Sequence, residues 1–440
     1  MMKLAEPDRD VFRFLLPIDP EKPVTWDNVE VWRYTRPLFG AASSPFQLAQ
    51  CIGKLLEGEQ NTVAQQLQPS IFAEVSKELE GNVFVDNTLL GALDPAEAKL
   101  KAKTSELIFK KANMNLRDHI SNCSEVSEFM NSTVPDIASF LGVKWKPKED
   151  VIFISIPYSK TVKKITKRTV LSFIASIFDP MGILAPVVFS GKVFLHSLWE
   201  ARKKWDTPLD ENELKQWNKF KECNEGKQVQ LKRYMLTKEA VARYLHVFVD
   251  ASDRGIAAVA FVREELDNGE FRVSLIICKT RIAPPNYATT PRLELMAAAL
   301  GAALIKFLLK ELPFIVHSIT LWSDSTCVIG WLMSDEKQGR FIENRKKFIL
   351  EVVVDIRHIR GPENPADTAS RGCKIDELAS LSKWWLGPKW LQLSEESWPP
   401  PTLNHLALEQ AVTNPSYEYA EPVAPDLPLL SSVPRKKLLN

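Results

Sequence analysis

Four acidic residues stand at the ends of predicted strands or the starts of predicted helices in the second half of this 440-residue chain. They are Asp250 in VFVDAS, Glu294 in TPRLELMAA, Asp324 in LWSDST and Asp367 in NPADTASRG. If these side chains converge, they cannot all stay ionised without cations, because like charges at short distance repel. Carboxylate oxygens are also the ligands that hard divalent ions prefer. The pattern therefore predicts a metal site suited to phosphoryl chemistry.

The residues around the acids predict the order three strands, helix, strand, helix, strand, helix. Apolar and β-branched runs predict strands over residues 244–249, 256–262, 273–278, 318–322 and 352–359. A helix is predicted over 293–312 by apolar side chains at helical spacing, which are Leu293, Met296, Leu300, Leu304 and Phe307 or Leu308. Further helices are predicted over 326–332 and from Pro365 onward. Two of the acids thus lie at strand ends and two at helix starts.

These motifs, and NPADTASRG and RLELMAA above all, resemble the ribonuclease H domain of Bel/Pao-type long-terminal-repeat retrotransposons. The likeness covers residues 244–373 and implies a ribonuclease H-like mixed five-stranded sheet flanked by helices. It implies that Asp250, Glu294, Asp324 and Asp367 are catalytic and hold two Mg²⁺ (or Mn²⁺) ions. The implied activity is endonucleolytic hydrolysis of the RNA strand of an RNA–DNA hybrid.

Related enzymes often carry a histidine on the loop before the last acid. The nearest candidate here is His358, which belongs to the apolar run 352–359. We therefore expect a strand histidine and leave it out of the catalytic set.

The N-terminal part resembles the reverse transcriptase of the same elements in incomplete form. The likeness rests on WRYT at 32–35, LFG at 38–40, SSPF at 43–46, and FLG at 140–142 with Trp145. VFVDN at 83–87 stands in the place of the family's YVDD turn, so Asp86 is followed by Asn87. An upstream acid that the two-metal reaction needs is expected before the first residue. We therefore expect a degenerate polymerase turn, no nucleotidyl transfer, and apolar surface left exposed by missing strands.

Residues 169–236 resemble the region that carries the label Pao peptidase A17. An aspartic protease needs Asp-Thr/Ser-Gly loops, whereas Asp179 is followed by Pro180, which lacks the bracing hydroxyl. We expect Asp179 to be a turn residue. Helical spacing over 187–205, and a possible second helix over 209–220, indicate a thumb or connection with a structural role.

A net charge of +1 means that nucleic-acid binding must rely on local patches. One candidate patch for phosphate contact consists of Lys160, Lys163, Lys164, Lys167 and Arg168. The alternative for this segment is a solvated linker. A second basic stretch holds Arg340, Arg345, Lys346 and Lys347, and it is also explained by an ordinary helix face.

The remaining sequence features concern core packing, disorder and cellular location. Trp384, Trp385, Trp390 and Trp398 are expected to pack against the nuclease domain, because aromatic side chains at this density favour burial. From Pro399 onward the composition predicts disorder. The six cysteines never form CxxC pairs, which predicts reduced thiols and a cytoplasmic or nuclear protein. No apolar run reaches the length of a membrane span.

The predicted organisation has an α/β and α+β multidomain fold with five segments. They are 1–157 (incomplete fingers and palm), 158–238 (thumb or connection), 239–376 (ribonuclease H-like), 377–398 (Trp-rich packed segment) and 399–440 (disordered tail). The favoured function is hybrid-directed ribonuclease H with a defective polymerase portion. The alternatives are a catalytically silent relic that at most binds nucleic acid and, less favoured, a peptidase. The sequence leaves the oligomeric state open.

Overall fold

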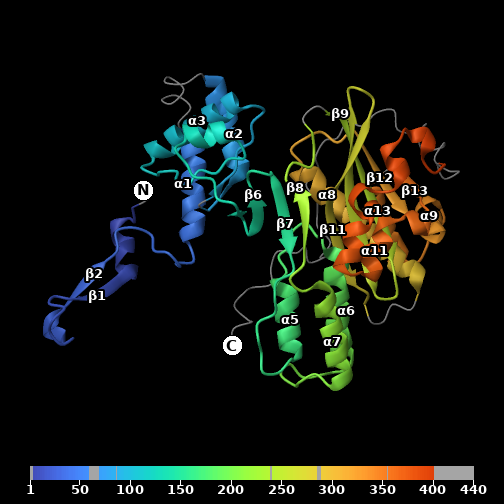
Figure 1. Cartoon of the computed structure of the whole chain (residues 1–440), viewed down its shortest axis with the longest axis horizontal. Coiled ribbons are helices and arrows are strands. Elements are labelled where there is room, and N and C mark those ends of the chain that lie inside the picture. The colour runs from blue at the N-terminus through green and yellow to red at the C-terminus, as the bar shows by residue number, and fades with distance from the viewer. Residues whose placement is uncertain are drawn as a thin grey trace.

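The structure is a computed structural model that describes residues 3–58, 69–85, 87–237, 240–284, 289–353 and 355–400 (Figure 1). The helices are α1 (Ser44–Gly58), α2 (Pro69–Asn82), α3 (Pro95–Lys111), α4 (Ser124–Phe129), α5 (Lys167–Ser176), α6 (Ala185–Glu200), α7 (Glu211–Asn224), α8 (Thr290–Glu311), α9 (Thr326–Met333), α10 (Arg340–Leu350), α11 (Pro365–Arg371), α12 (Ile375–Ser380) and α13 (Ser382–Leu386). Short 3-10 helices are η1 (Glu6–Phe12), η2 (Trp26–Asn28), η3 (Gly361–Glu363), η4 (Lys389–Gln392) and η5 (Glu395–Ser397). Within this part of the chain, no helix is both long and apolar enough to cross a membrane.

The strands form four separate sheets. They are β1 (Arg13–Pro17), β2 (Val29–Arg33), β3 (Val83–Phe84), β4 (Asn87–Thr88), β5 (Ala138–Phe140), β6 (Val143–Lys146), β7 (Val151–Ser155), β8 (Gln228–Lys232), β9 (Ala240–Ala251), β10 (Gly255–Leu266), β11 (Phe271–Ile282), β12 (Ser318–Ser323) and β13 (Asp355–His358). Two hairpins, β1–β2 and β3–β4, stand alone, β5 to β8 form a four-stranded sheet, and β9 to β13 form a five-stranded sheet.

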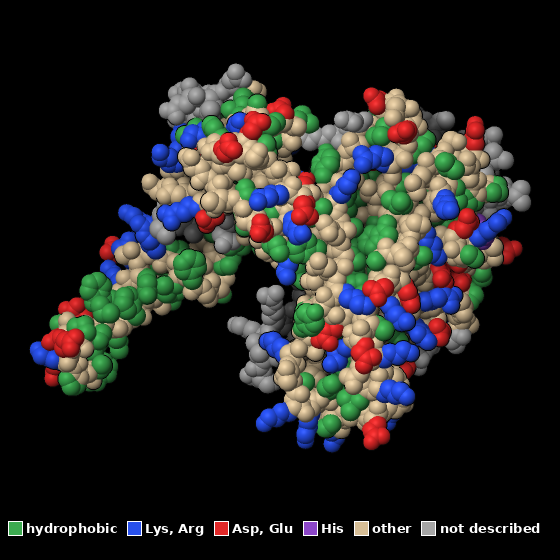
Figure 2. Space-filling view, viewed as in Figure 1, with side chains coloured by type: hydrophobic (Ala, Val, Ile, Leu, Met, Phe, Trp, Pro, Cys, Tyr) green, Lys and Arg blue, Asp and Glu red, His purple; other side chains and the backbone are tan. Residues whose placement is uncertain are grey.

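The N-terminal part has a small core and much exposed apolar surface. Helices α1, α2 and α3 pack around a cluster that includes Leu56, Phe72 and Ile108. The β1–β2 hairpin lies at one end of the molecule, and Figure 2 shows hydrophobic side chains along it. Trp26 is 85% exposed and Phe39 is fully exposed. The expectation of exposed apolar surface in this part is therefore confirmed.

The four-stranded sheet joins chain segments from both sides of the predicted boundary at 157/158. Strand β7 pairs with β8, which follows helix α7 in the sequence. At one end of this pair the Arg233 guanidinium lies 2.6 Å from the Asp150 carboxylate. The same carboxylate accepts a hydrogen bond from Trp145 Nε1 at 3.0 Å. Residues 138–155 and 228–233 thus form one structural unit.

The five-stranded sheet has the order β11-β10-β9-β12-β13. Strands β9, β10 and β11 are antiparallel, and β12 and β13 run parallel to β9 and to each other. This is the ribonuclease H-like mixed sheet that the sequence predicts. The predicted order of strands and helices is confirmed, with α10 added between α9 and β13.

Both faces of this sheet are buried. Because side chains alternate along a strand, Val247 and Val249 of β9 face α8, whereas Phe248 faces the opposite core. On the first face α8 packs closely, since a Cβ on Gly301 would lie 2.6 Å from Val249 Cγ1. Helices α9 and α10 complete that core.

Helices α5 to α7 contribute to the core on the opposite face. Val187 of α6 and Trp217 of α7 are buried in the same hydrophobic cluster as Phe248 and Phe261 of the sheet. Helix α6 approaches so closely that a Cβ on Gly255, at the start of β10, would lie 2.5 Å from the Phe189 ring. Helices α5 to α7 therefore cover the nuclease-like sheet, and a continuous core crosses the predicted boundary at 238/239.

The Trp-rich segment packs against the same face, as predicted. Trp384 is completely buried and donates a hydrogen bond from Nε1 to the carbonyl oxygen of Ile183 at 3.1 Å. Trp390 lies 4.7 Å from Trp322 of β12, measured between ring centroids. The buried Arg263 guanidinium of β10 donates to two backbone carbonyl oxygens of this segment, at 3.0 and 2.8 Å. The predicted disordered tail lies, from residue 401 onward, outside the described residues.

Candidate active site

Asp250 lies at the end of the central strand and is 5% exposed. Burial raises the pKa of this carboxyl to about 6, and the charges of Asp324 and Asp367 act in the same direction. A hydrogen bond from the Ser370 hydroxyl to Asp250 Oδ2 opposes this shift. The Asp250 carboxyl is therefore shielded from water and lies close enough to Asp324 and Asp367 to be affected by their charges.

Asp324 directly follows β12, which runs parallel to β9, so the two acids leave the same end of the sheet. Burial raises the pKa of Asp324, and the charge of Asp367 raises it further. The Asn364 side chain and the charge of His358 oppose that shift. His358 is the last residue of β13, which confirms the expected strand histidine, and its charge also acts on this acid.

Glu294 lies in the first turns of α8. Burial raises its pKa, with a contribution from the charge of Asp324, and the Ser325 hydroxyl donates a hydrogen bond to its Oε2. Ser325 is also the N-cap of α9 and accepts from the Val328 amide at 3.3 Å. One serine thus links the carboxylate on α8 to the start of α9.

Asp367 lies in the first turn of α11, and its carboxylate pairs with Arg371 one turn later. The helix is joined to β9 by Asn364, whose Nδ2 donates to the Val249 carbonyl oxygen at 3.0 Å. Asn364 is fully buried and also caps the helix, because its Oδ1 accepts from the Ala366 amide. These contacts hold Asp367 at the end of the sheet where Asp250 and Asp324 lie.

All four acids are predicted from the sequence, but the hydroxyl and amide side chains that hold them are not. Each of these side chains has a position in the sequence that could have identified it. Ser325 and Asn364 stand directly before predicted helices, where N-cap residues are expected. Ser370 lies three residues after Asp367, a spacing that places two side chains on neighbouring parts of a helix surface.

The donor set fits a hard divalent cation in its chemistry. Carboxylate oxygens suit such ions. Burial is the main cause that raises the pKa values of Asp250, Glu294 and Asp324, and a cation would relieve the repulsion between the acids that adds to it. Among the residues that the structure describes, however, no three of these acids lie in an arrangement that could already hold an ion.

The predicted polymerase turn lies in the short β3–β4 hairpin, where Phe84 pairs with Asn87. Asp86 lies outside the described residues. Val85 has a φ of 55°, which is unusual for a β-branched residue and marks a tight turn.

Asp179 has the turn role that the sequence predicts. Its two carboxylate oxygens accept hydrogen bonds from the amides of Ile183 and Leu184, at 2.8 and 2.7 Å, just before α6 begins. Burial raises the pKa of this carboxyl. Both carboxylate oxygens of Asp179 therefore accept hydrogen bonds from backbone amides of the same loop.

The basic patch predicted for phosphate contact divides into two kinds of residue. Lys160, Lys163 and Lys164 are exposed. Lys167 is only 3% exposed, and its Nζ lies 3.8 Å from the centre of the Trp199 ring and donates to the Lys203 carbonyl oxygen. The exposed Arg168 forms a two-point ion pair with Asp206, at 2.8 and 2.9 Å. Lys167 is therefore corrected to a structural residue, because it is buried between aromatic rings.

Residues 166–325 match the family model described as the Pao retrotransposon-like RNaseH-like domain. The resemblance to Pao-type elements is thus confirmed over this segment. The match begins at Thr166, the N-cap of α5, and so includes helices α5 to α7 together with Asp250, Glu294 and Asp324. No curated protein matches the chain.

Solved structures similar to parts of the chain include ribonucleases H and a reverse transcriptase. RNase H1 of the halophilic archaeon Halobacterium salinarum NRC-1 is 14% identical with a TM-score of 0.20, over 31% of this chain and 93% of its own. LC11-RNase H1 in complex with an RNA/DNA hybrid is 11% identical with a TM-score of 0.21, over 31% and 92%. Foamy viral protease-reverse transcriptase in complex with dsDNA is 13% identical with a TM-score of 0.20, over 78% and 65%.

Proposed function

We propose that this chain is a retrotransposon-derived ribonuclease H that cleaves the RNA strand of RNA–DNA hybrids. The observation that supports it most is the coupling of Asp250, Asp324 and Asp367 at one end of a ribonuclease H-like sheet. Structural ion-pair networks also shift pKa values, but they combine opposite charges. Asp250, Asp324 and Asp367 share one sign, although Asp367 is also paired with Arg371.

The four acids Asp250, Glu294, Asp324 and Asp367 would hold two Mg²⁺ or Mn²⁺ ions. Ions bound there would supply activation of a water molecule and stabilisation of the leaving 3′ oxygen. The residues of the chain keep the carboxylates in place: Ser370 holds Asp250, Ser325 holds Glu294, and Asn364 fixes the helix that carries Asp367. Because β9 and β12 are paired strands whose ends near the acids are buried, Asp250 and Asp324 have little freedom to separate.

The deciding experiment is a cleavage assay with the purified full chain. We expect a labelled RNA–DNA hybrid to be cut in Mg²⁺ or Mn²⁺ and spared in Ca²⁺, whose larger radius disfavours the short spacing between two ions. Single-stranded RNA and duplex DNA should be spared, because the substrate has 2′-hydroxyls on one strand only. Equal cleavage of all three substrates would contradict the proposal.

One observation favours the second candidate, a catalytically silent chain that at most binds nucleic acid. The Asp367 carboxylate is paired with Arg371, which neutralises one of the four acids. If the full chain binds the hybrid but does not cut it in either metal, this second candidate is the better description.

We also propose that the polymerase-like part transfers no nucleotides. Position 87 is an asparagine, and an amide oxygen is a neutral ligand that holds Mg²⁺ more weakly than a carboxylate does. Primer extension by the full chain should therefore fail, and Asn87→Asp alone should not restore it. Templated incorporation of nucleotides by the unmodified chain would overturn this proposal.

A further inference from the structure

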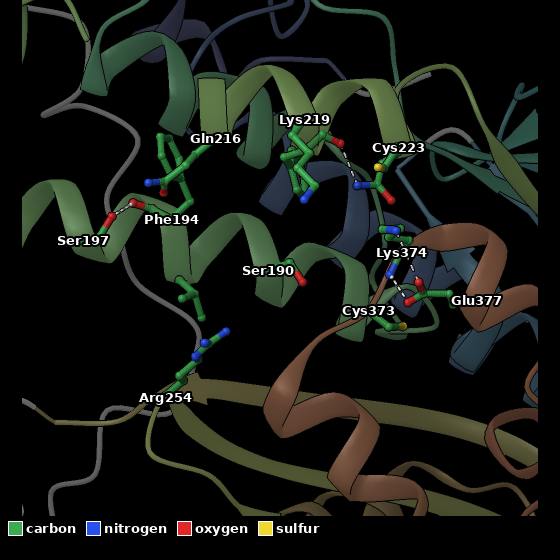
Figure 3. A pocket seen from close by; sticks show the side chains of 13 residues that line it. Ser190, Phe194, Ser197, Gln216, Lys219, Cys223, Arg254, Cys373, Lys374 and Glu377 are labelled. Atoms are coloured by element: carbon green, nitrogen blue, oxygen red, sulfur yellow. Dashed lines mark hydrogen bonds and ion pairs between the residues drawn. The ribbon is translucent and has the colours of Figure 1, made fainter. Parts of the chain in front are cut away.

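A cavity of about 630 Å³ lies between α6, α7 and the linker from α11 to α12. Lys219 of α7, Arg254 of the β9–β10 turn and Lys374 of the linker line it. Figure 3 shows these three basic side chains coming from different elements around the Ser190 turn of α6. The volume lies within the range of about 300–1,000 Å³ that is typical of ligand sites.

The cavity and the acids share two structural elements. Arg254 follows Asp250 by four residues, and the turn between them is held to α11 by a hydrogen bond from the Ser252 hydroxyl to the Ser370 carbonyl oxygen at 2.7 Å. Lys374 follows Asp367 by seven residues, most of which are in α11. Residues of the cavity lining thus lie on the same two chain segments as Asp250 and Asp367.

The positive charge at the cavity is mostly uncompensated. In the part of the chain that the structure describes, neither Lys219 nor Arg254 forms an ion pair. Lys374 pairs with Glu377, the acidic residue of the lining, at 3.5 Å, and both side chains are more than half exposed. Such an exposed pair is weak and can open for a stronger anionic partner. The lining therefore keeps a net positive charge, which suits an anion.

Part of the cavity lining is aromatic. Phe194 and Phe220 line it, and each stacks on the buried Trp217, with ring centroids 5.4 and 5.2 Å from the Trp217 ring. A lining with both aromatic and cationic side chains fits an anionic group that is attached to a planar or apolar body. A nucleotide has both parts.

We propose that this cavity binds one nucleotide unit of the nucleic-acid backbone, away from the bond that is cut. The phosphate contacts Arg254, Lys219 and Lys374, and the sugar or base lies against Phe194 and Phe220. The proposal rests on the proposed function, because it assigns the cavity to the same substrate. It gives helices α6 and α7 a part in binding substrate in addition to covering the sheet.

Binding without metal tests the cavity separately from catalysis. The affinity of the full chain for a labelled RNA–DNA hybrid is measured by fluorescence anisotropy in EDTA at several salt concentrations. Arg254→Ala and Lys219→Ala should each weaken binding about fivefold to tenfold and lower the slope of log affinity against log salt by about one. Arg254→Lys should recover most of the loss, since a phosphate accepts either cation. Lys215→Ala is the matched control, because Lys215 is an exposed lysine one turn away on α7 that does not line the cavity.

The outcomes separate the two proposals. If Arg254→Ala and Lys219→Ala bind like the Lys215→Ala control, the cavity assignment is overturned even when the parent cuts the hybrid. If both variants lose affinity while the parent never cuts, the cavity assignment is supported and only the nuclease proposal fails. In Mg²⁺ the same variants should raise KM more than they lower kcat, because the contact does not involve the reacting atoms. Displacement of the hybrid by free adenosine monophosphate as effective as that by unlabelled hybrid would overturn the assignment to nucleic-acid backbone.

Discussion

The Ser370 hydroxyl donates a hydrogen bond to Asp250 Oδ2, and this contact joins helix α11 to the end of strand β9. The two residues are 120 positions apart in the sequence. Asp250 is the most buried of the four acids, and the Ser370 hydrogen bond acts against the burial that raises its pKa. The serine therefore influences how readily the carboxyl ionises as well as where it lies.

Ser370→Ala should raise the pKa of Asp250 above its value of about 6, because the variant removes a hydrogen bond that stabilises the carboxylate. A hydrogen bond of this kind is worth about 1 kcal/mol, so a rise of roughly one pKa unit is expected. Titration of the Asp250 carboxyl by ¹³C NMR in the metal-free chain measures it. Asp250→Asn assigns the signal, and an unchanged pKa would show that this hydrogen bond is not formed in solution.

Asp250→Asn should stabilise the metal-free chain at pH 8 and leave its stability at pH 3 nearly unchanged. The folded pKa of Asp250 is raised from 3.8 to about 6, so the native state binds more protons than the unfolded state between these values. Stability therefore falls as pH rises through this window, by at most about 3 kcal/mol for this group, and the amide removes that loss. Thermal unfolding followed by tryptophan fluorescence at both pH values measures the difference. A larger gain at pH 3 than at pH 8 would contradict the argument.

Asp324→Asn should reduce hybrid cleavage by more than about a hundredfold without unfolding the chain. The substitution removes one negative charge from a site where like charges repel, so the metal-free fold should be no less stable. Cleavage rates and unfolding curves are compared with those of Asp253→Asn, an exposed acid in the nearby β9–β10 turn. If Asp324→Asn cut hybrid as fast as this control, the assignment of the four acids would be wrong.

Trp384→Ala should destabilise the nuclease-like part by about 3–5 kcal/mol, because it leaves a cavity where a fully buried ring packs. Trp384→Phe keeps most of the apolar volume and leaves the Ile183 carbonyl oxygen without its partner, so its cost should be about 1–3 kcal/mol. Urea unfolding of the two variants measures the difference. Trp385→Ala, a partly buried neighbour on the same helix, is the control and should cost less than Trp384→Ala.

Much of the nuclease-like sheet could be predicted from the sequence. The alternating and β-branched runs identify β9 to β13, and the helical spacing from Leu293 identifies α8, because these patterns reflect which face of a local element is buried. Asp250, Glu294, Asp324 and Asp367 could be selected because each stands at the boundary of such an element. The packing of Trp384 and Trp390 followed from their apolar area.

The remaining features depend on contacts between residues that are distant in the sequence. Lys167 belongs to a basic run, which made it a candidate phosphate ligand. In the fold, α5 packs against α6, and Lys167 is buried beside the rings of Trp199 and Trp205. The hydrogen bond from Trp384 to Ile183 spans 201 positions and attaches the Trp-rich segment to the loop before α6. Local patterns in a sequence report the burial of a strand or helix face, but they do not specify which distant surface covers it. For this reason the four acids could be identified from the chain alone, whereas the shared core, the serines that hold the acids and the cavity between α6 and α7 became visible only in the folded molecule.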